Sequence, residues 1–145
     1  MAKTICKLLG VVFILVGILG FLAPGLLGLH LSLAHNLVHI ISGALALYFG
    51  FAGTLSGAHL FCIVFGVVYG LLGLAGFLLG GSAAHGVGGV PASHHGATDS
   101  RLWAVLPGTL ELATVDHIVH LLLAVLFLVG GFLTKADVSR AIEEG

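Results

Sequence analysis

The sequence has very few charged residues, with only 5 Lys or Arg and 6 Asp or Glu among 145. None of them lies between residues 8 and 98, a run of 91 positions. A soluble surface needs about a quarter of its residues charged to stay solvated and unassociated. The shortage of charge therefore excludes a soluble globular protein, and five cations give no reason to expect a nucleic-acid partner.

The chain is instead mostly apolar, with 59% hydrophobic residues and a mean hydropathy of +1.20. A membrane-spanning helix needs about 20 apolar residues, because the hydrocarbon core is about 30 Å thick. Four segments qualify, near residues 5–22, 33–52, 58–79 and 113–133. Because lipid cannot satisfy exposed backbone groups, each should be helical. We therefore predict one all-α domain over residues 1–145, an integral membrane four-helix bundle with a long loop, rich in His and Gly, at residues 80–112.

Two internal repeats organise the chain. A shift of 56 positions aligns residues 6–25 with 62–81, and ten of the twenty pairs are identical. A shift of 81 positions aligns residues 30–50 with 111–131. The repeating unit is thus a helical hairpin, and two copies with two spans each enter the membrane in the same direction as parallel repeats. The difference, 81 − 56 = 25, indicates an insertion in the loop of the second hairpin.

The repeat also bears on the first segment, which has features of a signal peptide because Lys3 and Lys7 precede its apolar run. No clean small-x-small cleavage site precedes Pro24, and the segment recurs later in the chain. We therefore interpret it as a retained span.

Glycines recur at helical spacing in the first and third segments. Small residues let membrane helices approach closely and gain dispersion contacts. The predicted packing residues are Gly10, Gly17, Gly20, Gly66, Gly70, Gly73 and Gly76. The pattern does not identify the partner helix, which can belong to the same chain, to a second copy or to another membrane protein.

The cations predict the orientation. Lys3, Lys7, Lys135 and Arg140 flank the termini, whereas only Arg101 lies in the opposite loops. By the positive-inside rule both termini are expected to be cytoplasmic, with the 80–112 loop outside. Cys6 and Cys62 occupy equivalent positions, and we interpret them as reduced core residues rather than as a metal or redox pair.

Polar residues coincide when the second and fourth segments are aligned, as His39 does with His120 and His35 with Asp116. Unpaired polar groups are costly in lipid, so these side chains should face the bundle interior. Three interpretations stay open. The residues form structural hydrogen bonds between helices, or they bind a ligand, or they move protons or ions along the His35 and Asp116 face.

The ligand interpretation has two forms. A haem or another tetrapyrrole would lie between His39 and His120. Zinc or copper would instead take ligands from the wider set of His35, His39, Asp116, His117 and His120. In the loop, His85, His94 and His95 either are incidental or capture a divalent metal weakly.

No enzyme activity is expected. His35 to His39 resembles the zinc-protease pattern His-Glu-x-x-His, but Asn36 stands where the Glu would act as general base. The grouping of Ser93, His94 and Asp99 lacks a nucleophile elbow.

A resemblance to a known family rests on three motifs. They are His35-Asn36-Leu37-Val38-His39-Ile40-Ile41-Ser42-Gly43, Phe65-Gly66-Val67-Val68-Tyr69 and Asp116-His117-Ile118-Val119-His120. They resemble a widespread bacterial family of small four-helix membrane proteins that carry a domain of unknown function, with Asn-x-x-His opening helices 2 and 4. The resemblance implies this fold and a bacterial cytoplasmic membrane, but no activity. His117 replaces the usual Asn, and the insertion is longer than in that family.

Together these observations predict a non-enzymatic membrane protein that acts as a structural or accessory subunit of a larger assembly or homo-oligomer. The alternative is a membrane protein that binds a tetrapyrrole or a transition metal, and ion conduction is the third possibility.

Overall fold

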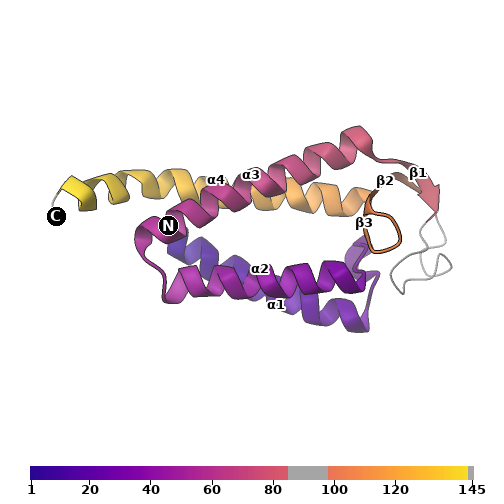
Figure 1. Ribbon diagram of the computed structural model, residues 1–145, viewed down its shortest axis with the longest axis horizontal. Helices are drawn as coiled ribbons and strands as arrows, with labels where there is room; N and C mark the ends of the chain where they lie inside the picture. The colour runs from indigo at the N-terminus through magenta and orange to yellow at the C-terminus, as the bar shows by residue number, and fades with distance from the viewer. Residues whose placement is uncertain (85–97, 144–145) are drawn as a thin grey trace.

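The computed structural model describes residues 1–84 and 98–143, and this part contains four long helices (Figure 1). Their bounds are α1 (Ala2–Leu22), α2 (Leu33–Phe51), α3 (Leu55–Leu79) and α4 (Thr114–Glu143). Each contains a stretch long and apolar enough to cross a membrane, which in α4 is Thr114–Thr134. The expectation of four long apolar helices is therefore confirmed.

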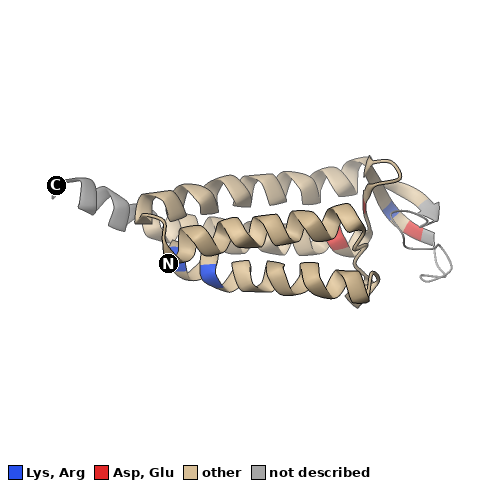
Figure 2. Ribbon diagram, turned by 60° about the horizontal axis from the view of Figure 1, so that its bottom comes forward, with Lys and Arg blue, Asp and Glu red and all other residues tan. Residues whose placement is uncertain are grey.

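The helices form two hairpins, α1 with α2 and α3 with α4, that lie side by side (Figure 1). The short 3₁₀ helix η1 (Leu26–Gly28) belongs to the connection between α1 and α2. Both chain ends lie at one end of the bundle, and the strands lie at the other. Among the described residues, charged residues lie towards the two ends of the bundle, while its middle has none (Figure 2).

The segment between α3 and α4 differs from the all-α prediction. It forms a three-stranded antiparallel sheet in the order β1 (Gly81–Ala84), β2 (Thr98–Leu106) and β3 (Leu110–Leu112). The β2–β3 turn has Pro107 and Gly108 at its centre, with Gly108 at φ +80°, and the Thr109 amide donates to the Leu106 carbonyl over 2.9 Å. These are the features of a type II turn, which favours Pro followed by Gly. His85, His94 and His95 lie outside the described residues.

Within each hairpin, the helices touch at glycines. A Cβ added to Gly17 on α1 would lie 2.9 Å from the Asn36 carbonyl oxygen on α2. A Cβ added to Gly73 on α3 would lie 2.9 Å from the His117 carbonyl oxygen on α4. These two contacts are related by the shifts of 56 and 81 positions found in the sequence. Because such distances leave no room for a side chain, glycine sets the spacing of both helix pairs.

The other five glycines predicted from the sequence also face the neighbouring helix of their own hairpin. Gly10 faces Leu47 and Gly66 faces Leu128, Gly20 faces the Asn36 side chain and Gly76 faces that of His117. A Cβ added to Gly70 would lie 3.5 Å from the Ala124 Cβ, which is an ordinary contact. All seven glycines named from the sequence therefore pack against the same chain, and the two hairpins have equivalent internal packing.

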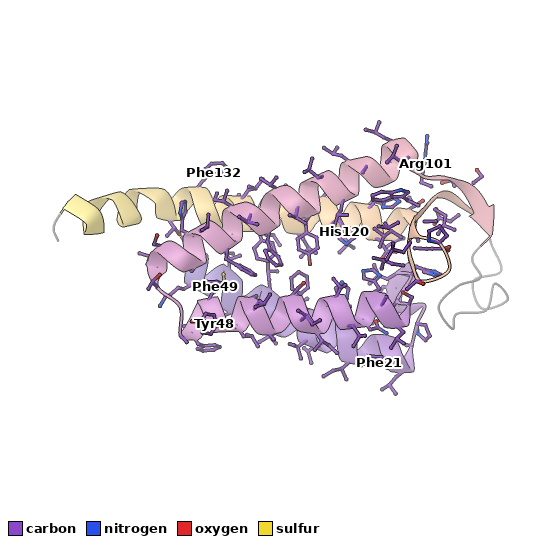
Figure 3. The ribbon with its side chains drawn as sticks, in the orientation of Figure 1. Phe21, Tyr48, Phe49, Arg101, His120 and Phe132 are labelled. Carbon is purple, nitrogen blue, oxygen red and sulfur yellow. The ribbon has the colours of Figure 1, made fainter. Side chains whose placement is uncertain are left out.

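The hairpins meet through a core of small and aromatic residues. The core includes Phe13, Phe61, Tyr69 and Phe127. At the end that carries the chain termini, the sulfur atoms of the repeat-related Cys6 and Cys62 lie 3.6 Å apart, and both side chains are fully buried. Large apolar side chains cover the outside of all four helices, among them Phe21, Tyr48 and Phe132, which point away from the bundle (Figure 3).

The glycine contacts lead to a matched prediction on α3. Gly73→Ala should lower the free energy of unfolding by about 1–3 kcal/mol, because its new methyl group meets backbone. Gly70→Ala should leave stability unchanged or raise it by up to about 1 kcal/mol, because alanine fits there and favours helix. Unfolding in mixed detergent micelles, followed by circular dichroism, measures both. Equal stability of the two variants would contradict the close α3–α4 contact.

Candidate functional site

The polar residues of the bundle gather where α2 and α4 begin. The Ser32 hydroxyl caps α2 by accepting a hydrogen bond from the His35 amide. In the first turn of α4, one carboxylate oxygen of Asp116 accepts from the Ala113 amide at 2.7 Å and from the His30 amide at 3.0 Å. His30 belongs to the first hairpin and Asp116 to the second. Asp116 therefore both stabilises the start of α4 and joins the two hairpins.

The sheet is fixed to this end of the bundle by side chains. The Asp99 carboxylate accepts from the Thr114 amide at 3.1 Å and from the Thr114 hydroxyl at 2.6 Å, which caps α4. His117 donates from Nε2 to the Arg101 carbonyl oxygen over 2.7 Å. The Ser32 hydroxyl donates to the Thr109 carbonyl oxygen over 2.9 Å. The insertion is thus attached to both hairpins at the polar end.

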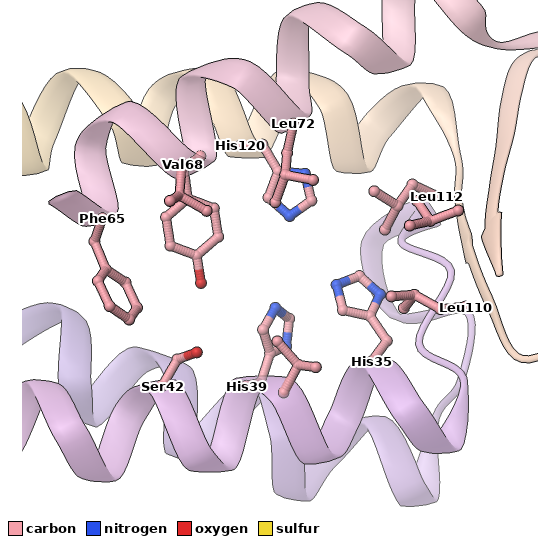
Figure 4. Close-up of a pocket in the computed structure, with 12 residues that line it drawn as sticks. His35, His39, Ser42, Phe65, Val68, Leu72, Leu110, Leu112 and His120 are labelled. Carbon is pink, nitrogen blue, oxygen red and sulfur yellow. The ribbon is translucent and has the colours of Figure 1, made fainter.

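Three histidines converge below this polar layer, as Figure 4 shows for His35, His39 and His120. Their side chains are only 3%, 6% and 4% exposed. The ring centroids of His35 and His39 are 4.5 Å apart, and those of His35 and His120 are 6.1 Å apart. The sequence prediction that His39 and His120 face the interior therefore agrees with this geometry, and His120 points between the hairpins (Figure 3).

The protonated nitrogen of His35 is fixed by its partner. His35 Nδ1 lies 2.8 Å from the His30 carbonyl oxygen, which can only accept a hydrogen bond. Nδ1 therefore carries a hydrogen and donates it to this carbonyl oxygen. The bond fixes the orientation of the His35 ring beside His39.

His39 and His120 have equivalent surroundings. The His39 ring stacks on Phe13 at 5.7 Å, and the His120 ring lies 5.3 Å from Tyr69, which is the repeat counterpart of Phe13. Nδ1 of each histidine is buried without a hydrogen-bond partner among the described residues, as is one oxygen of Asp116. A buried polar atom without a partner costs about 1–3 kcal/mol. The cluster thus contains unsatisfied hydrogen-bonding groups at repeat-related positions.

Two cavities flank the histidines. The larger, about 180 Å³, lies between α2 and α3, and the smaller, about 60 Å³, lies between α1 and α4. The larger is lined by His35, Val38, His39, Ser42, Phe65, Val68, Tyr69, Leu72, Val105, Leu110, Leu112 and His120. The smaller is lined by Val12, Phe13, Val16, Leu29, His35, His39, Asp116, Val119, His120 and Leu123. Most of the residues that line one cavity are related by the internal repeat to residues that line the other. The two cavities therefore occupy equivalent places in the bundle.

The predicted metal ligands are not brought around one point. His117 faces Gly76 and the Arg101 carbonyl oxygen, away from His39 and His120. Among residues 1–84 and 98–143, no three His, Cys, Asp or Glu side chains are placed to hold an ion. His117 is the repeat counterpart of Asn36. Its side chain packs on Gly76 of the neighbouring helix, just as the Asn36 side chain packs on the repeat-related Gly20.

A tetrapyrrole does not fit the cavities as they stand. An apolar cavity of about 150 Å³ holds one benzene molecule, and pockets for drug-sized ligands have about 300–1,000 Å³. The larger cavity, about 180 Å³, lies near the lower of these sizes. The geometry therefore favours a ligand of about one ring rather than a macrocycle between His39 and His120.

The core also provides no polar path along the bundle. From the histidines towards the chain termini, the interior is filled by aromatic rings in mutual contact. Tyr69 stacks on Phe127 at 6.0 Å, and Phe61 stacks on Phe65 at 4.0 Å. The polar groups His35 and Asp116 are thus confined to one end, which gives ion conduction no support in the described residues.

Tyr69 and Ser42 also belong to this site. Helical spacing from His35 and His39 predicts that Ser42 lies on their face, whereas sequence reasoning missed Tyr69. The signal for both residues was present in the repeat alignment, where Tyr69 replaces Phe13 and Ser42 replaces Leu123. Both exchanges introduce a hydroxyl on the same side of the histidine cluster.

Comparison with known proteins gave no match: no family model, no curated protein and no solved structure matches this chain. The resemblance to the bacterial four-helix family stays a prediction.

Asp116 provides the stability prediction for this site. Asp116→Ala should lower the free energy of unfolding by about 1–3 kcal/mol, because the Ala113 and His30 amides lose a buried acceptor. Asp116→Asn keeps one acceptor oxygen and should retain most of the stability. Detergent unfolding curves measure the difference, and a wild-type curve for the alanine variant would contradict the joining role of Asp116.

Proposed function

We propose that this chain is an integral membrane protein that binds a small lipid-soluble molecule between its two hairpins. The observation that carries the proposal is a pair of repeat-related buried imidazoles, His39 and His120, which line a cavity of about 180 Å³ and whose Nδ1 atoms have no hydrogen-bond partner among the described residues. Ionisable residues inside membrane bundles are costly and commonly mark functional sites. A bound molecule that hydrogen-bonds these nitrogens recovers part of the cost of burying them.

The apolar outer surface supports the membrane location. Large exposed side chains such as Leu15, Leu71 and Leu122 occur on the outside of the helices. Soluble monomers rarely expose contiguous apolar patches larger than a few hundred Å². We place both termini on the cytoplasmic side of a bacterial inner membrane, with Lys3 and Lys7 on that side and the sheet outside.

The accessory-subunit interpretation has lost part of its basis. It rested in part on the glycine faces, for which the sequence left the partner open, and Gly10, Gly17, Gly66 and Gly73 are in contact with α2 or α4 of the same chain. We therefore propose ligand binding as the main role, without a catalytic step.

The proposed orientation predicts how two exposed serines react after substitution by cysteine. Ser100 lies on β2 at the sheet end, and Ser56 lies at the start of α3 at the opposite end. In whole spheroplasts a membrane-impermeant maleimide should label Ser100→Cys but not Ser56→Cys, and in inverted vesicles the reverse. The native cysteines are fully buried and should give little background. The opposite labelling pattern would refute the orientation.

Ligand binding predicts a mass adduct on the native protein. Native mass spectrometry of protein gently extracted from its own membrane should show a small molecule bound to the single chain. The double variant His39→Phe with His120→Phe should lose it, because both unpartnered nitrogens are removed while ring packing is kept.

His59→Phe is the control, because His59 lies in the first turns of α3 and does not line either cavity. It should keep the adduct. A bare wild-type chain, or an adduct retained by the double variant, would contradict the proposed function, and release from a larger assembly would favour an accessory subunit.

A further inference from the structure

The two cavities beside the histidines are related by the internal repeat, but they differ in size and polarity. Their volumes are about 180 Å³ and about 60 Å³. Ser42 in the larger cavity corresponds to Leu123 in the smaller one, and Tyr69 corresponds to Phe13. The shorter Ser42 side chain leaves space that Leu123 fills in the other cavity. The larger cavity therefore has more space than the smaller one, and it has two hydroxyl groups where the smaller one has Phe13 and Leu123.

The two hydroxyl-bearing residues are buried and line the same cavity from different helices. Tyr69 on α3 is 5% exposed and Ser42 on α2 is 8% exposed. Burying polar groups costs free energy that Phe and Leu avoid at the counterpart positions. Hydroxyls can donate and accept, so this pair can serve a ligand that carries an oxygen atom.

The volume limits the ligand to about one six-membered ring. A cavity of about 150 Å³ is enough for benzene, so about 180 Å³ accommodates a benzene ring with a small substituent. Phe65, Leu72 and Leu110 provide apolar walls for the ring faces and edges. The His39 and His120 rings line the cavity as polar groups. This combination suits an aromatic ring that carries a hydroxyl group.

The cavity reaches the outer surface between α2 and α3. Val38 on α2 and Val68 on α3 both line it, and they are 45% and 46% exposed. In the proposed membrane setting that surface faces lipid. At the polar end, Val105 of β2 and Leu112 of β3 line the cavity. The ring of a ligand can therefore enter the cavity from the bilayer between α2 and α3, while its alkyl chain stays in the lipid.

From these observations we infer that the larger cavity binds the ring of a lipid-soluble phenol, with its alkyl tail remaining in the bilayer. The ring hydroxyl is recognised by the Tyr69 and Ser42 hydroxyls, beside the His39 and His120 rings. The inference rests on the proposed function and names its ligand class. The smaller cavity, about 60 Å³, is below the size needed for the ring.

Competition labelling tests the ligand class. The purified full chain in lipid nanodiscs is photolabelled with a diazirine-bearing 4-alkylphenol, and labelled peptides are mapped. Unlabelled 4-octylphenol should compete, and the labelled residues should lie on α2 and α3. Octylbenzene, which lacks the oxygen, should compete about tenfold less well, as expected for the loss of one or two hydrogen bonds. Equal competition by octylbenzene would overturn recognition of the hydroxyl.

Two variants that introduce the corresponding residues of the smaller cavity test where the phenol binds. Ser42→Leu should abolish competable labelling because it fills the space, and Tyr69→Phe should weaken binding by about 2- to 10-fold because it removes one hydroxyl. His59→Phe, at a position that lines neither cavity, should leave labelling unchanged. Circular dichroism checks folding, and if Ser42→Leu does not fold, Tyr69→Phe decides. Unchanged labelling in Tyr69→Phe would overturn the assignment.

The result is distinguishable from failure of the proposed function. If wild-type protein shows no competable phenol labelling but carries a mass adduct that requires His39 and His120, the ligand class is wrong and the binding role stands. If it shows neither labelling nor adduct, both proposals fail.

Discussion

The contact between glycine and the facing helix backbone is the constraint on which the rest of the structure depends. Between membrane helices no hydrophobic effect drives association, so close packing must hold the pairs together. At Gly17, an added Cβ would lie 2.9 Å from the Asn36 carbonyl oxygen and 3.2 Å from the His39 Cβ. The contact therefore sets the rotation of α2 as well as its distance from α1. His39 points into the core because the residue one turn before it lies against glycine.

The equivalent contact at Gly73 acts on α4 and directs His120 towards the same space. Two copies of one packing arrangement thus produce a nearly symmetric histidine cluster. The departures from symmetry lie around that cluster. His35 is matched by Asp116, Tyr69 by Phe13 and Ser42 by Leu123, and β2 supplies a wall residue to one cavity only. A symmetric framework therefore holds an asymmetric site, and few side chains are responsible for the difference.

The sequence was sufficient for the parts of the fold that depend on repeated local patterns. The apolar runs predicted four helices, and the polar positions predicted inward-facing His39 and His120. The sheet was missed because β1 and β3 have only 4 and 3 residues, and because the stretch before β2 is rich in glycine and histidine. The direction of His117 depends on its packing against Gly76, a tertiary contact that residue type alone does not reveal. Cavity size likewise follows from several side chains packing together, although Ser42 and Tyr69 stand out in the repeat alignment.

The paired thiols at the opposite end of the bundle have a consequence for how motion in this molecule can be followed. Cys6 and Cys62 come from different hairpins, occupy equivalent positions and touch at 3.6 Å where the hairpins meet. Because both are fully buried, a thiol reagent reaches them only when the hairpins part or the helix ends open locally. The rate at which a thiol reagent modifies Cys6 and Cys62 therefore measures how often the two hairpins separate or their helix ends open. No residue has to be replaced to follow this motion.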